Sequence, residues 1–333
     1  MASSIVLQAD LRAPADPDEV RGRLAALTDQ HPHLGASPMV HTVDPVGAVR
    51  DRFAATPYRD GAALLRIAVG VREPTLVLAA HHGAVDGLGL LAVLGAALGH
   101  PARTSAAGVG DRPPATSFAG SVPRRLAEAA LWPPTRLWRA PGPAGGAEPG
   151  EVLLAMRVAP ERTGTAALAA AALDVTTWWN GLHRTEVARV VAAIGASRHD
   201  DRAALRPEHR AAFLRLRLPV GSGRDEVRAQ LAGQAPEPDL PVGESRLARL
   251  ACQLLTDRLG ATFLVSNVGI VDVGGAVRSL AFYPQVSGPA GIAFGAVTTA
   301  TSTVLTVRAR RRDFAPEAAA LLLGRLATAL SHA

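Results

Sequence analysis

The 333-residue sequence has no lysine and only one cysteine, and just 4% of its residues are aromatic. Apart from histidine, every basic side chain is therefore an arginine, and arginine carries the formal net charge of +6. The single cysteine, Cys252, excludes both an internal disulfide framework and a cysteine zinc site. Since this composition fits a reducing compartment, we expect a cytoplasmic protein.

The shortage of aromatic residues also bears on the partner. Basic residues are not interleaved with aromatic ones, so the positive charge does not indicate nucleic-acid binding and fits acidic partners instead. No secretory signal is visible, because Asp10 and Arg12 interrupt the early apolar sequence. The uncharged stretch 279–307 contains Pro284 and Pro289, so it predicts paired strands and no membrane association.

What the sequence does contain is enough apolar residues, 48%, to build a large core. Periodicity and turn residues predict strands at 3–11, 40–43, 62–69, 75–80, 152–158, 212–219, 262–268, 277–284, 291–299 and 303–310. They predict helices at 19–31 (capped by Asp16 or Asp18), 46–54, 88–98, 123–131, 164–182, 184–194, 226–233, 245–259 and 316–332.

Strands and helices thus alternate in both halves, which indicates a mixed α/β (α+β) chain. The segment PGPAGGAEPG, residues 141–150, has the composition of a linker. We therefore expect an N-terminal lobe over residues 1–140 and a C-terminal lobe over residues 151–333.

The most informative stretch is LVLAAHHGAVDGLGL, residues 76–90. Its pattern predicts a buried strand that ends at His81 and His82, a sharp loop, and a core-facing helix after Asp86 and Gly87. Histidine is a natural general base near neutral pH because its pKa lies there. This stretch is therefore the predicted centre of the chemistry.

HHGAVDG resembles the HHxxxDG motif of the CoA-dependent acyltransferase superfamily, which includes nonribosomal-peptide condensation domains, polyketide-associated acyltransferases and chloramphenicol-acetyltransferase-like enzymes. Other segments resemble further landmarks of that superfamily, and they occur in its order along the chain. They are RLAALTDQHPHLGA (23–36), GAALLRIAV (61–69), ATFLVSNVG (261–269) and the closing strand and helix at 303–330. The chain departs from the pattern in lacking a DFGWG-type motif and in being shorter than typical members.

This resemblance implies a fold of two chloramphenicol-acetyltransferase-like lobes, each a mixed sheet with helices, arranged as a V-shaped pseudo-dimer. It also implies an acyltransferase of the condensation type, which forms an ester or an amide in natural-product biosynthesis. The donor would be a thioester on CoA or on the phosphopantetheine arm of an acyl or peptidyl carrier protein. The acceptor would be a small-molecule amine or alcohol, and no permanently bound cofactor would be needed.

The same resemblance assigns roles to individual residues. His82, the second histidine of the motif, would be the general base, and His81 would help to fix the loop. Asp86 would turn away from the substrate and form a salt bridge with Arg66, while Gly87 would allow a tight backbone. In the C-terminal lobe, Ser266 or Asn267 would face His82 and stabilise an oxyanion.

Several alternatives remain open from the sequence. Ser266 and Asn267 are equally consistent with ordinary capping of a strand end. A metal site at His82 and Asp86 would need further ligands that no pattern supplies. His209, with two other histidines, and the basic run at 308–312 are predicted to face solvent. The chain could also be a binding or recruitment module, or a cyclising enzyme that uses the cleft without a thioester.

Overall fold

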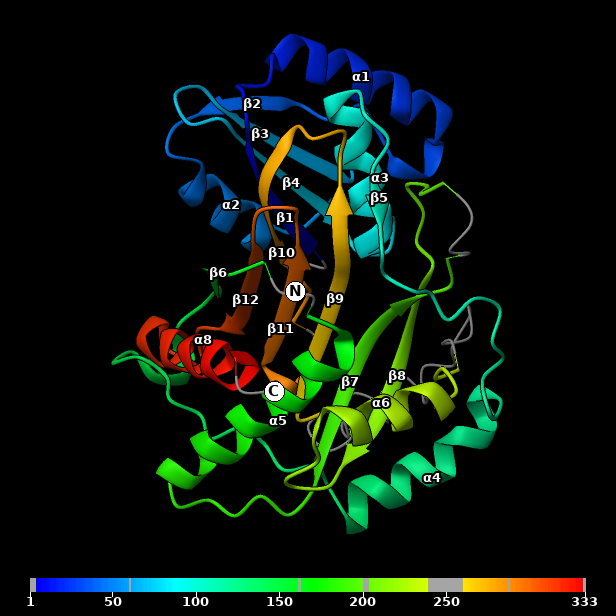
Figure 1. Ribbon diagram of the computed structural model, residues 1–333, viewed down its shortest axis with the longest axis vertical. Coiled ribbons are helices and arrows are strands. Elements are labelled where there is room, and N and C mark those ends of the chain that lie inside the picture. The colour runs from blue at the N-terminus through cyan, green and yellow to red at the C-terminus, as the bar shows by residue number, and fades with distance from the viewer. Residues whose placement is uncertain are drawn as a thin grey trace.

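The computed structural model describes residues 4–59, 61–160, 163–199, 204–238, 260–286 and 288–331. These residues form two mixed sheets, of five and seven strands, with helices packed against them (Figure 1). The first sheet and its helices lie in the upper part of that view, and the second sheet lies below. The predicted mixed α/β class with two lobes is confirmed.

The first sheet is built mainly from the N-terminal part of the chain. Its strands, in spatial order, are β10 (Val277–Tyr283), β1 (Ser4–Leu11), β4 (Thr75–His81), β3 (Leu65–Gly70) and β2 (Val40–Val43). Strand β1 is antiparallel to both β10 and β4, and β2 is parallel to β3. Since β1 and β4 are central, their apolar residues are buried on both faces.

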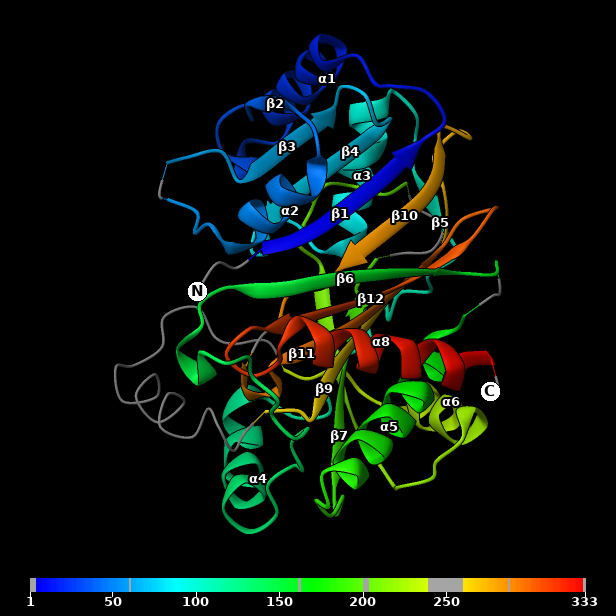
Figure 2. The same cartoon turned by 90° about the vertical axis from the view of Figure 1, so that its left-hand side faces the viewer.

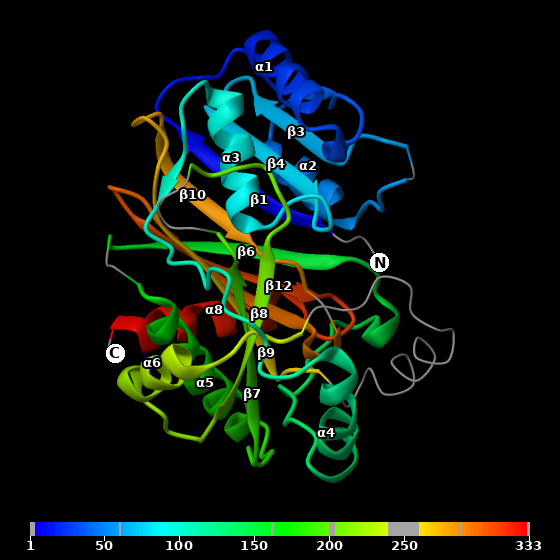
Figure 3. The same cartoon turned by 90° about the vertical axis from the view of Figure 1, so that its right-hand side faces the viewer.

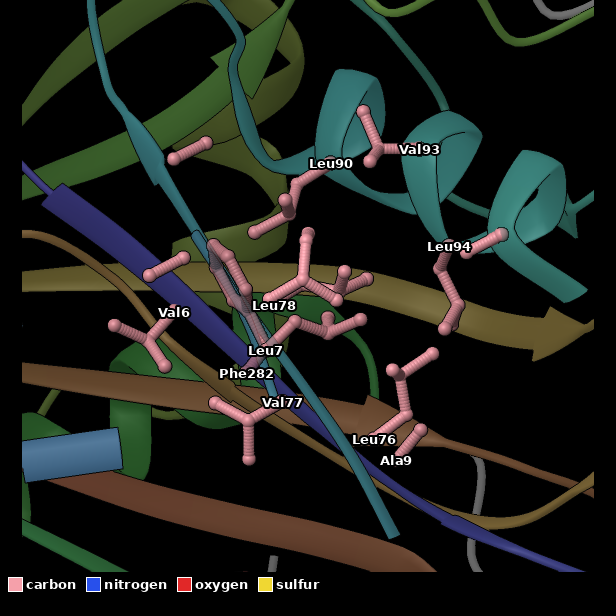
Figure 4. Packing of buried hydrophobic residues seen from close by; sticks show 14 of the residues in the cluster. Val6, Leu7, Ala9, Leu76, Val77, Leu78, Leu90, Val93, Leu94 and Phe282 are labelled. Carbon is pink, nitrogen blue, oxygen red and sulfur yellow. The ribbon is translucent and has the colours of Figure 1, made fainter. Parts of the chain in front are cut away.

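Helices cover both faces of this sheet. They are α1 (Pro17–Gln30) and α3 (Gly87–Leu98) on one face, and α2 (Val46–Ala55) on the other (Figures 2 and 3). Asp16 caps α1, as the sequence predicts, by accepting hydrogen bonds from the backbone N–H groups of Asp18 and Glu19. Figure 4 shows how Leu90 of α3, Leu78 of β4 and Phe282 of β10 meet in the buried core.

The second sheet is built mainly from the C-terminal part of the chain. Its main path is β6 (Glu151–Val158), β12 (Thr303–Arg310), β11 (Ile292–Thr298), β9 (Phe263–Asp272), β7 (Val190–Ser197) and β8 (Ala211–Leu218), and the short β5 (Arg103–Thr104) pairs with the end of β9. Its helices are α4 (Phe118–Leu131), α5 (Thr165–Leu182), α6 (Arg224–Gly233) and α8 (Pro316–Ser331).

Two strands cross between the halves. β5 comes from the N-terminal part of the chain but pairs with β9, and β10 follows β9 in sequence but pairs with β1. The chain therefore passes from the second sheet to the first and back again at residues 272–292 (Figure 1). The division into lobes at 1–140 and 151–333, with a linker at 141–150, stays a prediction.

Two helix predictions were wrong in detail. The segment predicted as a helix at 184–194 contains the start of strand β7, which lies between β8 and β9. Its small residues also suit a helix, but pairing on both sides decides the outcome. Helix α4 begins at Phe118, five residues before the predicted start, because Ser117 caps it and Pro123 lies inside its first turns. The helix predicted at 245–259 lies outside the described residues.

Polar contacts join the two halves. Arg308 of β12 is 0% exposed, and its guanidinium donates to Glu151 at 2.7 Å and to the backbone oxygen of Ser4 at 2.6 Å. Arg157 of β6 likewise donates to Asp10 at 2.9 Å. The prediction that the basic run at 308–312 faces solvent was therefore wrong for Arg308, because every second residue of β12 points towards the first sheet. It was also wrong for Arg310, which is buried and paired with Asp313. Among the described residues no helix is both long and apolar enough to cross a membrane.

Candidate active site

His82 lies in the loop immediately after strand β4. Its Nδ1 is 3.2 Å from the backbone oxygen of Val85. Because a carbonyl oxygen can only accept a hydrogen bond, this contact places the ring proton on Nδ1 as the donor. Nε2 is then the nitrogen with a free lone pair in the neutral ring. Burial lowers the pKa of His82, and the neighbouring His209 lowers it further, although the hydrogen bond to Val85 opposes them. The imidazole is therefore neutral at neutral pH.

Asp86 is 4% exposed and is held by the second sheet as well as by its own loop. One carboxylate oxygen caps α3 by accepting from the Gly89 N–H at 2.8 Å. The other accepts from the Ser197 hydroxyl of β7 at 2.9 Å and from the Arg210 N–H at 3.3 Å. The motif aspartate thus connects the two halves of the molecule.

The expected salt bridge between Asp86 and Arg66 is absent, since no ion pair joins these two described residues. The Arg66 guanidinium instead donates to the backbone oxygens of Phe53, Thr56 and Pro57, at 2.9, 2.5 and 2.7 Å. It also lies over the Tyr58 ring, 3.8 Å from the ring centroid. Arg66 therefore supports the end of α2, where free carbonyls attract a guanidinium.

His81 and Gly87 shape the loop around His82. The Nδ1 of His81 accepts a hydrogen bond from the Gly83 N–H at 3.1 Å, and the His81 ring packs edge-on against Tyr58. At Gly87 a Cβ atom would lie 3.1 Å from the Phe282 ring and 3.3 Å from Val268. Gly87 thus permits the start of α3 to approach β9 and β10 closely.

A cavity of about 490 Å³ opens beside His82, between the two halves. This volume is in the range of small-molecule sites. Its walls come from the loop after β4, the segment 105–109, the start of α5, strands β7 to β9, and α6. His82, Asp86, Ser266 and Asn267 all line it, so the structure brings together the motif and the two residues predicted from the C-terminal lobe.

Ser266 and Asn267 differ in whether their side chains can form a hydrogen bond to a ligand. The side-chain amide of Asn267 donates to the Thr163 backbone oxygen at 2.6 Å, and its oxygen accepts from the Gly269 N–H at 2.9 Å. Both ends of that side chain are therefore used to hold neighbouring loops. The Ser266 hydroxyl has no hydrogen-bond partner among the described residues and lines the cavity, so it can donate to a ligand.

His209 is the residue at this site that the sequence did not reveal. Its ring centroid lies 5.3 Å from that of His82, edge to face, although it was predicted simply to face solvent. The segment that carries it links β7 to β8 and reaches α3, where the Glu208 backbone oxygen accepts from the Asp86 N–H at 3.2 Å (Figure 3). Nothing in the local pattern around His209 points to this contact, because it depends on how the halves meet.

A metal centre is not formed by the described residues, since no group of three or more His, Cys, Asp or Glu side chains is placed to hold an ion. The polar residues that line the cavity include His82, Ser266 and Asn267, which carry an imidazole, a hydroxyl and an amide. These groups can accept a proton and donate hydrogen bonds to a developing negative charge.

No family model and no curated protein matches this sequence. Solved structures do match over nearly the whole chain. The first condensation domain of the calcium-dependent antibiotic synthetase, in complex with a substrate analogue, has a TM-score of 0.61 at 16% identity, over 99% of this chain and 90% of that one. The cyclization-docking bidomain of EpoB from Sorangium cellulosum has a TM-score of 0.62 at 13% identity, over 99% of this chain and 80% of that one.

A third match is the epimerization domain from the third module of tyrocidine synthetase B, with a TM-score of 0.59 at 13% identity, over 98% of this chain and 90% of that one. Similarity of this extent at such low identity establishes the fold, which is the two-lobe fold of condensation and epimerization domains. The fold expected from the HHxxxDG resemblance is therefore confirmed.

Proposed function

We propose that this chain, which has the fold of condensation and epimerization domains, transfers an acyl group from a thioester to an amine or hydroxyl in the assembly of a natural product. The observation that carries the proposal is His82, whose pKa is lowered by burial and whose Nδ1 is fixed by a hydrogen bond to Val85, at the wall of a cavity between the halves. Fold alone does not determine chemistry, so the proposal depends on this imidazole.

In the proposed reaction, Nε2 of His82 removes the proton from the acceptor nitrogen or oxygen as that atom attacks the thioester carbonyl carbon. A carbon–nitrogen or carbon–oxygen bond forms, and negative charge develops on the carbonyl oxygen. The Ser266 hydroxyl is the available donor for that oxyanion. The carbon–sulfur bond then breaks, and the proton held by His82 passes to the departing thiolate.

The donor would be carried by CoA or by the phosphopantetheine arm of a carrier protein. A solved structure with the same fold supports this, since a double mutant of the starter condensation domain of rhizomide synthetase RzmA was crystallised with C8-CoA and Leu-SNAC. In this chain Asp86 would position His82 indirectly, by fixing the loop and the start of α3.

The test is a transfer assay with acyl-N-acetylcysteamine donors and a panel of amines and alcohols, with product detected by mass spectrometry. We expect His82→Ala to lower the rate by about a hundred- to ten-thousand-fold, because positioned general-base catalysis contributes that much. His183→Ala is the matched control, since His183 caps the end of α5 and lies outside the cavity wall. Equal rates for His82→Ala and the wild type would refute the proposal, and thioester binding without transfer would identify a binding module.

A further inference from the structure

The cavity has an arm that is lined by aliphatic side chains. Between β7, β8 and α6 its wall includes Ile194, Ala196, Ala212, Leu214 and Leu231, which we call the apolar arm. Ile194 and Leu214 belong to the buried core under α5, and Ala196 and Leu231 pack against that core from the edge. The apolar arm therefore borders the hydrophobic core of the second sheet.

Glycines let the backbone around the cavity pack closely. Gly108 lines the cavity beside the end of β7, and a Cβ there would lie 2.2 Å from the His199 backbone oxygen. Gly195 lines it as well, and a Cβ there would lie 3.1 Å from the Ser266 hydroxyl. Polar residues also line the cavity, among them His82, Ser266 and the hydrogen-bonded pair Asn267 and Thr163. One cavity thus combines a polar reaction region with an apolar extension.

The charged groups beside the apolar arm also affect which chains can bind there. Arg112 and Arg228 line the cavity next to α6, and among the described residues Asp86 is the only acidic side chain that lines it. Arg112 donates to the Gln234 backbone oxygen at 2.9 Å, at the end of α6, and Arg228 is paired with Asp225 on the exposed side of that helix. Two guanidinium groups at this end disfavour a chain that terminates in an ammonium group.

We propose that the apolar arm binds a flexible aliphatic chain with an uncharged end, carried by one of the two substrates. An alkyl chain gains free energy when its surface leaves water for the side chains of Ile194, Leu214 and Leu231. The same chain chemistry occurs in an acyl donor and in an alkyl acceptor. The proposal rests on the function proposed above for its link to His82, but binding itself can be measured without any transfer.

The test uses probes that cannot react. Two series are titrated calorimetrically: S-alkyl-N-acetylcysteamine thioethers as donor analogues, and N-alkylacetamides as acceptor analogues, each with two to ten carbons in the alkyl chain. We expect Kd to fall about fourfold per added methylene in one series, since each buried methylene contributes that much. The series that responds identifies the substrate that carries the chain. No dependence on chain length in either series would overturn the proposal.

Variants of residues in and outside the apolar arm test whether the gain in affinity per methylene arises there. Leu231→Asn places an amide in the arm and should abolish the gain per methylene, whereas Ala229→Asn on the same helix, outside the cavity wall, should leave it intact. Ala196→Phe should shorten the longest chain that binds. Equal effects of Leu231→Asn and Ala229→Asn would contradict the assignment. Acetyl transfer that depends on His82 but shows no preference for chain length would refute this inference and leave the proposed function standing.

Discussion

The two sheets differ in the side chains that their faces carry. The first sheet is packed with aliphatic side chains on both faces (Figure 4). In strand β4 every residue from Leu76 to Ala80 is apolar and buried. The second sheet is apolar where it meets α5 and α8, but its other face carries Arg308 and Thr306. The first sheet therefore holds His82 on an apolar support. The second sheet holds the contact between the two halves, which we call the seam, through polar contacts such as Arg308 with Ser4 and Ser197 with Asp86.

This difference separates two tasks at the candidate site. Packing in the N-terminal half places His82, because the loop that carries it follows directly from the buried strand β4. Polar contacts from the C-terminal half fix Asp86 and shape the cavity. The contrast predicts that changes at the polar seam affect both stability and transfer, whereas similar changes elsewhere affect stability alone.

The largest effect is expected at Arg308. Arg308→Met leaves Glu151 without its buried partner and should lower the free energy of unfolding by about 3–5 kcal/mol, measured by urea denaturation. The double variant with Glu151→Leu should recover most of that loss, because an apolar pair replaces the ion pair. Arg21→Met, which breaks an exposed pair with Asp18, should cost less than about 0.5 kcal/mol. Equal losses for Arg308→Met and Arg21→Met would show that the seam is not held in this way.

Asp86 comes next, and α1 offers its control. Asp86→Ala removes a helix cap together with the acceptor for Ser197 and Arg210, and should cost about 3 kcal/mol. Asp16→Ala removes only the cap of α1 and should cost about 1 kcal/mol. Thermal or urea unfolding measures both. A cost for Asp86→Ala no greater than that for Asp16→Ala would mean that its contacts across the seam contribute nothing.

Ser197→Ala isolates one bond across the seam. Its hydroxyl donates to a buried carboxylate, so its removal should cost about 1.5–3 kcal/mol and should also reduce transfer. Ser121→Ala is the comparison, because that hydroxyl donates to a neutral backbone carbonyl within α4, and its loss should cost about 1 kcal/mol without a change in transfer. If both variants keep full transfer activity, Asp86 does not depend on β7 for its position.

The smallest effect is expected at His209. Its proximity lowers the pKa of His82, so His209→Asn should raise that pKa towards its ordinary value. Since only the neutral imidazole can act as a base, the acid limb of the transfer rate should then move to higher pH. Measuring the rate between pH 4 and 8 for both proteins tests this. A limb that moves to lower pH, or does not move, would contradict the coupling.

Much of the fold follows from the sequence, because most elements have a clear local signal. Strand β4 and helix α3 are apolar runs separated by His82 and Asp86, and Asp16 marks the start of α1. Strand β7 was missed because Ala192, Ala193 and Ala196 suit a helix equally well. Its pairing with β8 and β9 is a contact between distant segments that no local pattern records.

The candidate site also contains residues that the sequence predicts and residues that only long-range contacts determine. His82, Ser266 and Asn267 were expected at one cleft, and they do line one cavity. The partner of Asp86 was wrong, because Ser197 and Arg210 come from a part of the chain that only the folded arrangement brings there. His209 and the apolar arm were likewise unpredictable, since both are set by how β7, β8 and α6 approach the first sheet.

The central claim is that His82 is a neutral base at the seam, and an NMR titration of its ring in protein labelled with ¹⁵N at histidine tests this directly. His82→Gln assigns the resonances by their loss. We predict a pKa below the ordinary 6.5, with the proton on Nδ1 and a free lone pair on Nε2 at neutral pH. A pKa at or above 6.5, or a neutral ring with its proton on Nε2, would contradict the account.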